Sequence, residues 1–164
     1  MVIQTPPNPI LACIALGSNM GDSHTHLSQA CDAMDELPGT RLVHRSRFIK
    51  TQPVGPINQA VFLNAAVVME TNLSPSGLLK SLNAIELKHG RDDLTSRVKW
   101  GPRPLDLDII FYDSLVYDEE DLVIPHPLMH ERWFVLKPLA EIVPDWVHPI
   151  LGLTVVQMLD NVKP

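Results

Sequence analysis

The sequence predicts an α+β fold with an antiparallel sheet, and three observations support this class. Apolar runs of strand length alternate with segments whose apolar residues recur at helical spacing. Pro and Gly residues separate these segments, as expected where strands and helices end. The resulting order is strand, helix, strand, strand, helix, strand, with further elements at the C-terminus. A chain of 164 residues can bury a core, and we expect a single domain over residues 1–164.

A buried strand and a capped helix are predicted first. Residues 10–16 form a nearly continuous apolar run, which is typical of a central strand. Asp22 or Ser23 can cap a helix that runs to about Leu37, where Pro and Gly follow. Residues 1–9 are rich in proline, and we expect them to form a flexible tail.

Two further strands and a second helix come next. Residues 41–51 and 62–71 are predicted strands, joined by a loop that prolines stiffen. Ser74 begins a helix with Pro75 at its first position, where proline is favoured, and Gly90 ends it. Together with the last strand, described next, this order predicts a ferredoxin-like βαββαβ core with an antiparallel sheet and extra C-terminal elements.

The most informative stretch is residues 98–112, in which a rigid turn containing Arg103 leads directly into the last core strand. Asp106 and Asp108 project from the same face of that strand, because side chains change face with every residue. Their backbone positions are roughly 6.5–7 Å apart, so the carboxylates repel each other unless a cation lies between them. Mg²⁺ suits this gap because it takes oxygen ligands and works with phosphates. The side chains expected to project from the opposite face into a core are Leu105, Leu107, Ile109 and Phe111.

An Asp-x-Asp pair also occurs on the solvent face of half-exposed strands, and the alternation alone does not exclude that interpretation. Trp100, Pro102 and Pro104 favour a site, because an exposed edge needs no rigid turn to direct an arginine at its acidic face. Arg103 can grip a pair of phosphate oxygens with its planar guanidinium. Together these residues predict a site for metal-bound phosphate.

Composition argues against several classes of protein. The formal net charge of −6 disfavours nucleic-acid binding, which rewards basic surfaces. No apolar run reaches the roughly 18 residues of a membrane span, and the start lacks the layout of a signal peptide. Cys13 and Cys31 have no motif spacing and are predicted to be buried thiols. We therefore expect a cytoplasmic protein without a nucleic-acid or membrane partner.

Residues 100–109, Trp-Gly-Pro-Arg-Pro-Leu-Asp-Leu-Asp-Ile, resemble the signature of the 6-hydroxymethyl-7,8-dihydropterin pyrophosphokinase family of folate biosynthesis. The resemblance extends from Ala15 to about Leu159. It implies a ferredoxin-like fold and the transfer of pyrophosphate from ATP to the hydroxymethyl group of the dihydropterin, with release of AMP. The further motifs, in the same order, are Gly17-Ser18-Asn19, Pro53-Val54-Gly55-Pro56, Phe62-Leu63-Asn64-Ala65-Ala66 and Ile124-Pro125-His126-Pro127.

The resemblance also implies roles for individual residues. Asp106 and Asp108 would ligate two Mg²⁺ ions that bridge ATP and the hydroxymethyl oxygen, and Arg91 and Arg103 would act with them in catalysis. Phe62 and Phe134 would sandwich the pterin ring. The full pterin-binding set is Thr51, Pro53, Val54, Phe62, Asn64, Trp100 and Phe134. The ATP-binding set is Glu86, Arg91, Arg103, Ile109, His126 and Arg132.

Several of these residues have an ordinary structural alternative. Aromatic side chains such as Phe62 usually pack in a core, and a helical glutamate such as Glu86 usually faces solvent. Asn64 lies in an apolar strand, where an unpartnered amide is costly, so we expect it to have a partner. His126 and His130 stand four residues apart, but without a third ligand they do not predict a zinc site.

Some features depart from the family pattern. Lys99 stands where arginine is common, Asp121 stands where a basic residue can occur, and the loop over residues 91–99 is longer than usual. That loop, which includes Arg97, has few apolar residues and is expected to be mobile without substrates and ordered around them. From the residues alone, a non-catalytic binding module and a metal-dependent phosphohydrolase stay open. We expect a monomer that acts on ATP and 6-hydroxymethyl-7,8-dihydropterin.

Overall fold

The computed structural model describes residues 9–52, 55, 59–90 and 104–164. Its core contains five strands and two helices. In chain order these are β1 (Ile10–Ser18), α1 (Ser23–Asp35), β2 (Thr40–Arg45), β3 (Ile49–Thr51), β4 (Phe62–Thr71), α2 (Pro75–Lys88) and β5 (Asp106–Tyr112). The C-terminal part contains β6 (Tyr117–Glu119), β7 (Leu122–Ile124), a 3₁₀ turn (Met129–Glu131), α3 (Trp133–Ile142) and α4 (Val155–Asp160).

The main sheet is antiparallel at every described pairing. Its strand order is β2-β4-β1-β5, and the short β3 pairs with β4 beyond the end of β2. This is the order of a split βαββαβ arrangement. The two strands that each helix connects, β1 and β2 for α1 and β4 and β5 for α2, are not adjacent in the sheet. The predicted α+β class, with its antiparallel sheet and C-terminal additions, is confirmed.

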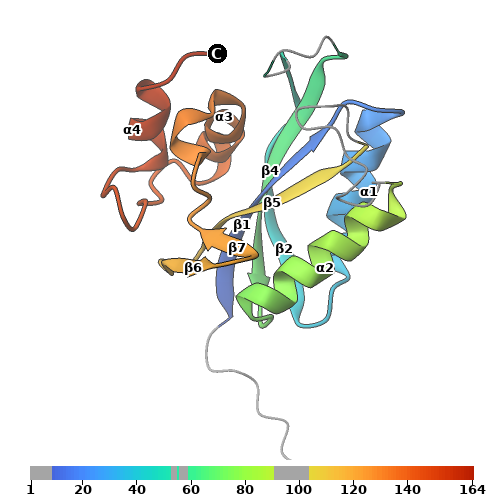
Figure 1. The fold of residues 1–164 in the computed structure, drawn as a ribbon, viewed down its shortest axis with the longest axis horizontal. Coiled ribbons are helices and arrows are strands. Elements are labelled where there is room, and N and C mark those ends of the chain that lie inside the picture. The colour runs from blue at the N-terminus through green and yellow to red at the C-terminus, as the bar shows by residue number, and fades with distance from the viewer. Residues whose placement is uncertain (1–8, 53–54, 56–58, 91–103) are drawn as a thin grey trace, which may run out of the picture.

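Helices cover both faces of the sheet. In Figure 1, α1 and α2 lie against one face and α3 and α4 against the other. Each face has its own core cluster. The cluster under α1 and α2 includes Ile14, Leu16, Leu27, Leu78, Leu82, Leu107 and Ile109. The cluster under α3 and α4 includes Cys13, Ala15, Ala66, Phe111, Leu136, Leu139 and Met158.

The helices begin at the side chains that the sequence indicated. The backbone N–H of Thr25 donates to Oδ1 of Asp22 (3.1 Å), and that of Gly77 donates to Oγ of Ser74 (3.1 Å). Each acceptor satisfies a backbone donor that the first turn of a helix leaves without an intrahelical partner. Gly90 follows α2 with a φ of 84°, a conformation that favours glycine. These caps explain why helix positions were predictable from local sequence.

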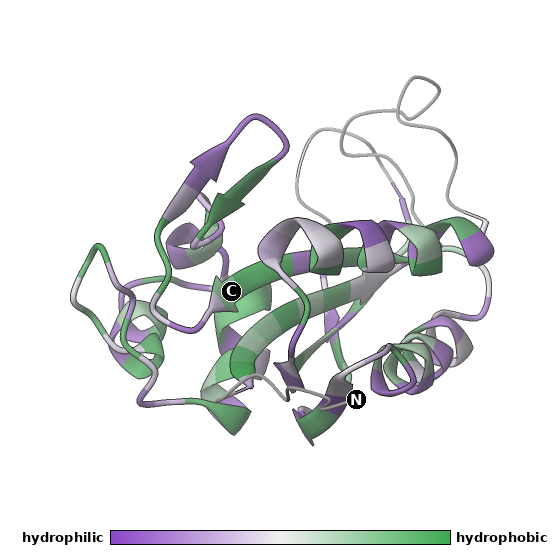
Figure 2. Ribbon diagram, turned by 90° about the horizontal axis from the view of Figure 1, so that it is seen from below, coloured by the Kyte–Doolittle hydropathy of each residue, from purple (hydrophilic) through white to green (hydrophobic). Residues whose placement is uncertain are grey.

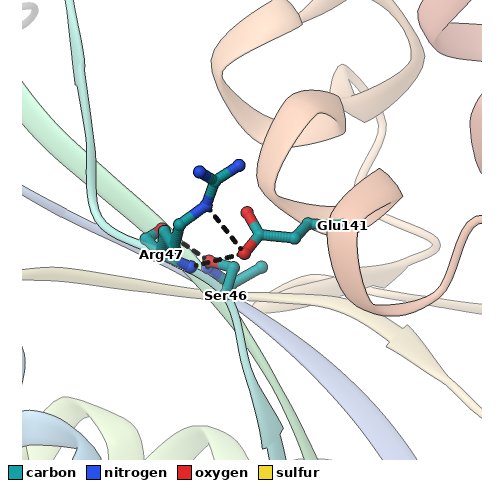
Figure 3. A network of polar contacts seen from close by, with 4 residues as sticks. Ser46, Arg47 and Glu141 are labelled. Carbon is teal, nitrogen blue, oxygen red and sulfur yellow. Dashed lines mark hydrogen bonds and ion pairs between the residues drawn. The ribbon is translucent and has the colours of Figure 1, made fainter.

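The predicted strand over residues 41–51 is wrong in one respect, because it is interrupted between β2 and β3. Ser46 turns its hydroxyl into the sheet, where Oγ accepts from the backbone N–H of Ala66 (2.8 Å). The next residue, Arg47, then leaves the ladder and contacts Glu141 of α3 through its backbone N (3.1 Å) and Nε (3.2 Å) (Figure 3). The hydroxyl of Ser46 thus takes the place of a backbone carbonyl as the acceptor for the N–H of Ala66 on the partner strand.

Phe111 also departs from the prediction, which placed it on the same face as Leu107 and Ile109. The β1–β5 register shifts between Cys13 and Ile14, so that Ile14 pairs with Ile109 and Cys13 with Phe111. The extra residue in β5 reverses the alternation of side chains beyond that point. Phe111 therefore lies in the core under α3 and α4, stacked on Trp146 with ring centroids 5.4 Å apart.

The remaining parts of the chain are simpler. In Figure 2 the hairpin of β6 and β7 has one hydrophilic and one hydrophobic strand, and the hydrophobic one, β7, contacts β5. Cys13 and Cys31 are buried free thiols, as predicted, and burial raises the pKa of both. Among the helices in the described ranges, none has the length and apolar character needed to span a membrane.

Candidate active site

Three adjacent strands bring the predicted pterin and metal residues into cross-strand rows. Gly17 of β1 pairs with Asn64 of β4 on one side and with Asp106 of β5 on the other. Directly paired residues of antiparallel strands project from the same face of the sheet. Two residues away on β1, Ala15 pairs with Ala66 of β4 and with Asp108 of β5. We call these six residues the site floor.

The site floor lies on the face that α3 and α4 cover elsewhere. Cys13 and Val68, further along the same strands and in phase with the floor, belong to the core under α3 and α4. The polar groups of the floor are the amide of Asn64 and the two carboxylates, and the small residues Gly17 and Ala15 separate them. The same face is therefore apolar and packed at one end, and polar at the other.

Asp106 and Asp108 stand on β5 as the alternation predicted. Both are half-buried, whereas Leu105, Leu107 and Ile109 are buried in the core on the opposite face. Within the described residues, no cluster of three or more His, Cys, Asp and Glu side chains is placed to hold a metal. Mg²⁺ is commonly bound through one or two carboxylates, with water and substrate phosphates as the other ligands. The donor set therefore fits Mg²⁺ bound together with a polyphosphate.

His126 and Arg132 approach the floor from the C-terminal part of the chain. Burial and, to a smaller extent, the positive charge of Arg132 lower the pKa of His126 from 6.5 to about 4, and the negative charge of Asp106 opposes the shift. Nδ1 of His126 accepts from the backbone N–H of Leu128 (3.2 Å), so the neutral ring carries its proton on Nε2. The ring is thus a neutral donor near neutral pH, within electrostatic range of an aspartate and an arginine.

Asn64 has the partner that its buried position requires. The side chain is 7% exposed, and its Nδ2 donates a hydrogen bond to Oγ1 of Thr51 on β3. Oδ1 is directed toward Gly17, because a Cβ added at Gly17 would lie 3.0 Å from this oxygen. The φ of Gly17 is not in the left-handed region, so the requirement for glycine here is one of space.

The two predicted stacking rings are not buried core residues. Phe62 and Phe134 are both half-buried, and Phe62 Cδ1 would lie 3.9 Å from a Cβ at Gly17. Phe134 packs at the margin of the core under α3 and α4. Cζ of Arg132 lies 5.7 Å from the centroid of the Phe134 ring, which is cation–π distance. The structure thus brings Phe62 to the floor and pairs Phe134 with a predicted phosphate ligand.

Two predicted ATP residues are buried, Ile109 as the alternation of β5 predicted and Glu86 contrary to the usual exposure of a helical glutamate. The side chain of Ile109 is 3% exposed in the core on the opposite face, so only its backbone is available to a nucleotide. Glu86 does not face solvent, as a helical glutamate usually does. It is buried, and its Oε2 accepts from the backbone N–H of Leu107 (2.8 Å).

Other predictions fall outside the described residues or concern the surface. Asp121 is exposed in the turn between β6 and β7. The predicted positions that lie outside the described ranges are Pro53, Val54, Arg91, Arg97, Lys99, Trp100 and Arg103. Their roles stay predictions.

Sequence reasoning gave no individual role to Gly17 or to Asn19, which the structure connects to the site. Nδ2 of Asn19 donates to Oε1 of Gln59 (2.7 Å) and to the carbonyl of Ala60 (3.0 Å). These bonds join the end of β1 to the segment that leads into Phe62. The only available signal was the polar Gly-Ser-Asn sequence at the end of an apolar run.

The chain is similar in sequence to a known protein family and to individual members of it. Residues 13–144 match the family of 7,8-dihydro-6-hydroxymethylpterin-pyrophosphokinase (HPPK). A 2-amino-4-hydroxy-6-hydroxymethyldihydropteridine pyrophosphokinase of Methylorubrum extorquens is 43% identical over 153 residues, covering 93% of this chain and 94% of that protein. The Bacillus subtilis enzyme of the same name is 46% identical over 132 residues, covering 80% and 77%.

Solved structures show the same fold. The chain superposes on the crystal structure of Plasmodium falciparum HPPK-DHPS wild type with a TM-score of 0.71 at 14% identity, covering 96% of this chain and 45% of that one. The chain thus spans less than half of that protein, and at this identity the likeness concerns the fold alone. With the match over residues 13–144 and the two bacterial relatives, the chain belongs to the 7,8-dihydro-6-hydroxymethylpterin-pyrophosphokinase family of folate-biosynthesis enzymes, as residues 100–109 predicted.

Proposed function

We propose that the site floor is where this pyrophosphokinase transfers the terminal pyrophosphate of ATP to the hydroxymethyl group of 6-hydroxymethyl-7,8-dihydropterin, releasing AMP. The observation that carries the proposal is the cross-strand row in which Gly17 separates the amide of Asn64 from the carboxylate of Asp106. The row brings together a group suited to the edge of a flat heterocycle and one suited to a metal-bound phosphate. Pyrophosphoryl transfer requires both to be held at fixed separation.

Asp106 and Asp108 would hold two magnesium ions. When bound, these ions neutralise the triphosphate and stabilise charge on the attacking and leaving oxygens. The protein contributes the rigid placement of the two carboxylates, since both belong to a strand whose other face is fixed in the core. Little covalent chemistry is left for a side chain, so positioning and charge supply most of the rate enhancement.

The pterin would lie on the Asn64 side of the floor. Thr51 fixes the orientation of the Asn64 amide, which leaves Oδ1 on the side of Gly17 as an acceptor for an N–H on the ring edge. Phe62 and Phe134 would stack on the two faces of the ring. Stacking there would require the Phe134 ring to offer the pterin a face that Arg132 does not cover.

The triphosphate would lie on the Asp106 side. His126 would donate from Nε2, and Arg132 would supply a fixed positive charge close to it. The remaining groups proposed for this side are Arg91 and Arg103, with Trp100, Pro53 and Val54 completing the pterin pocket. We also propose that the protein acts as a monomer, since the site floor is assembled from the strands of one chain.

A single assay tests this function against its rivals. ATP, Mg²⁺ and the enzyme are incubated with and without 6-hydroxymethyl-7,8-dihydropterin, and AMP, ADP and phosphate are measured. We expect AMP only when the pterin is present, in a one-to-one ratio with pyrophosphorylated product. A phosphohydrolase would release phosphate or pyrophosphate without the pterin, and a binding module would bind ligands without forming AMP.

A matched pair of variants places the reaction at the floor. Asp108→Ala should lose AMP production, whereas Asp118→Ala, at an exposed aspartate of β6, should retain it. Equal activity in the two variants would show that the chemistry occurs elsewhere.

A further inference from the structure

Glu86 has a buried carboxylate that the steps above do not use. It lies on α2, is 5% exposed and is the only buried carboxylate in the described ranges. Removing a carboxylate from water is costly unless hydrogen bonds replace its hydration. Its Oε2 accepts from the backbone N–H of Leu107 at 2.8 Å, a charge-assisted hydrogen bond. The position of this acceptor indicates what the buried charge does.

Leu107 is the residue between the two aspartates, on a strand with one neighbour. In the described sheet, β5 pairs only with β1, through Asp106 with Gly17, Leu107 with Leu16 and Asp108 with Ala15. Alternate N–H groups of such an edge strand point away from its neighbour and lack a ladder partner. Glu86 supplies the acceptor that a further strand would have provided, at the centre of the Asp-x-Asp segment.

We propose that Glu86 is a positioning residue for Asp106 and Asp108. By holding the peptide between them, it would fix the rotation of β5 about its own axis, and with it the direction of both carboxylates. Partners behind the ligands commonly tune metal sites in this way, because ligand direction decides whether both ligands can reach the metal. This inference rests on the proposed metal role of the aspartates. It also replaces the contact with ATP that the family resemblance implied for Glu86.

α2 is a suitable support for this contact. Leu78 and Leu82 of the same helix are fully buried in the core beneath it. The helix is therefore fixed by packing, and a side chain on it can hold a strand edge without moving itself. Through Glu86, the packing of α2 on the apolar face of the sheet would help to fix the direction of the two aspartates on the polar face.

The test uses three variants of the full chain. Glu86→Gln keeps an acceptor oxygen but removes the charge, and Glu86→Ala removes both. Ile85→Ala is the matched control, because Ile85 is the adjacent residue, is also 5% exposed and has an apolar side chain that cannot accept from Leu107. Circular dichroism and thermal melting confirm folding before any comparison.

Two readouts separate positioning from packing. Amide hydrogen exchange at Leu107, measured by NMR in the metal-free protein, should accelerate at least about tenfold in Glu86→Ala but remain close to wild type in Glu86→Gln and in Ile85→Ala. The Mn²⁺ concentration for half-maximal binding with a non-hydrolysable ATP analogue should rise about tenfold or more in Glu86→Ala and less in Glu86→Gln. Ile85→Ala should leave it unchanged, and ATP binding without metal should be the same in all three variants.

Other results would overturn the assignment. Unchanged Leu107 exchange in Glu86→Ala, or equal metal affinity in Glu86→Ala and Ile85→Ala, would remove the positioning role. Weaker metal-free ATP binding in Glu86→Ala would show direct contact instead. Asp108→Asn serves as the reference: if it binds Mn²⁺ normally, the proposed metal site fails and this inference fails with it. If Asp108→Asn loses Mn²⁺ and Glu86→Ala does not, only the role of Glu86 is overturned.

Discussion

The two faces of the central sheet are built from the same strands but differ in character. On the face under α1 and α2, Leu16, Leu107 and Ile109 continue an apolar cluster along the strands. On the other face, the apolar cluster under α3 and α4 stops, and the strands continue with Asn64, Gly17 and the two aspartates. Alternation along one strand thus separates residues that stabilise the fold from residues available for chemistry. Substitutions on the two faces should therefore affect different measurements.

The largest expected effect is on the polar face. Asp106→Ala and Asp108→Ala should each lower turnover on the order of 10³-fold, because each removes one of the two proposed metal ligands. Thermal melting without metal should show unchanged or raised stability, since a repulsion between two nearby carboxylates is removed. AMP formation and melting temperature are the two measurements. Turnover like that of the wild type in Asp108→Ala would contradict the assignment of the floor.

The apolar face should show the opposite pattern. Leu27→Ala removes a fully buried side chain of α1 and should cost about 2–5 kcal/mol in free energy of unfolding, measured by urea denaturation. At a temperature where the variant remains folded, its turnover should stay close to that of the wild type. A loss of turnover without a loss of stability would mean that the two faces are not separable in this way.

The pH dependence of stability should reveal His126. Burial lowers the pKa of this imidazole from 6.5 to about 4. The unfolded chain therefore takes up the proton first, so the stabilising contribution is present above pH 6.5 and is lost as the pH falls toward 4. For a half-buried ring we expect a loss of roughly 2 kcal/mol over that window. His126→Gln should flatten this part of the profile, and a profile equal to that of the wild type would show that His126 does not cause it.

The aromatic residues test whether the polar face has separate sides for the pterin and for ATP. Phe62→Ala and Phe134→Ala should weaken pterin binding by about 1 kcal/mol or more, which is roughly fivefold or more in Kd, because each removes a proposed stacking surface. ATP binding should change much less. Calorimetric titration with each ligand separates the two effects. Equal losses for both ligands would indicate that these rings only pack against the protein.

Gly17→Ala gives the smallest predicted effect. Its new Cβ would lie 3.0 Å from Oδ1 of Asn64, so the amide must shift by a few tenths of an ångström. A crowded contact of this kind costs about 1 kcal/mol, so we expect the KM for the pterin to rise several-fold with the KM for ATP unchanged. An unchanged pterin KM in Gly17→Ala would show that Asn64 does not need this space.

Local chemistry explains which features the sequence predicted. The caps at Asp22 and Ser74 and the alternation around Asp106 depend on neighbours within a few residues, so they are readable from one segment. The break at Ser46 and the shift at Phe111 were missed because each is decided by pairing with a distant strand. The same holds for Glu86, whose partner is 21 residues away and is a backbone N–H without a sequence signal.

Site prediction followed the same division. The half-buried aspartates could be predicted from spacing, and the need of Asn64 for a partner from the cost of burying an amide. That Thr51 is this partner, and that Gly17 provides the space beside it, depends on how three strands align. The family resemblance implied roles for individual residues without explaining how their surroundings hold them.

The two outer edges of the described sheet also bear on self-association. β2 presents exposed Arg41 and Arg45 at one edge, and Arg41 is paired across to Glu70 of β4 (N–O distance 3.0 Å). At the other edge, Glu86 occupies the N–H of Leu107, and β7 lies beside β5. Charged side chains and covered backbone groups discourage strand-to-strand pairing between molecules. Both edges of the described sheet are thus poorly suited to pairing with a strand of another molecule, and at one of them Glu86 removes a hydrogen-bond donor that such a strand would need.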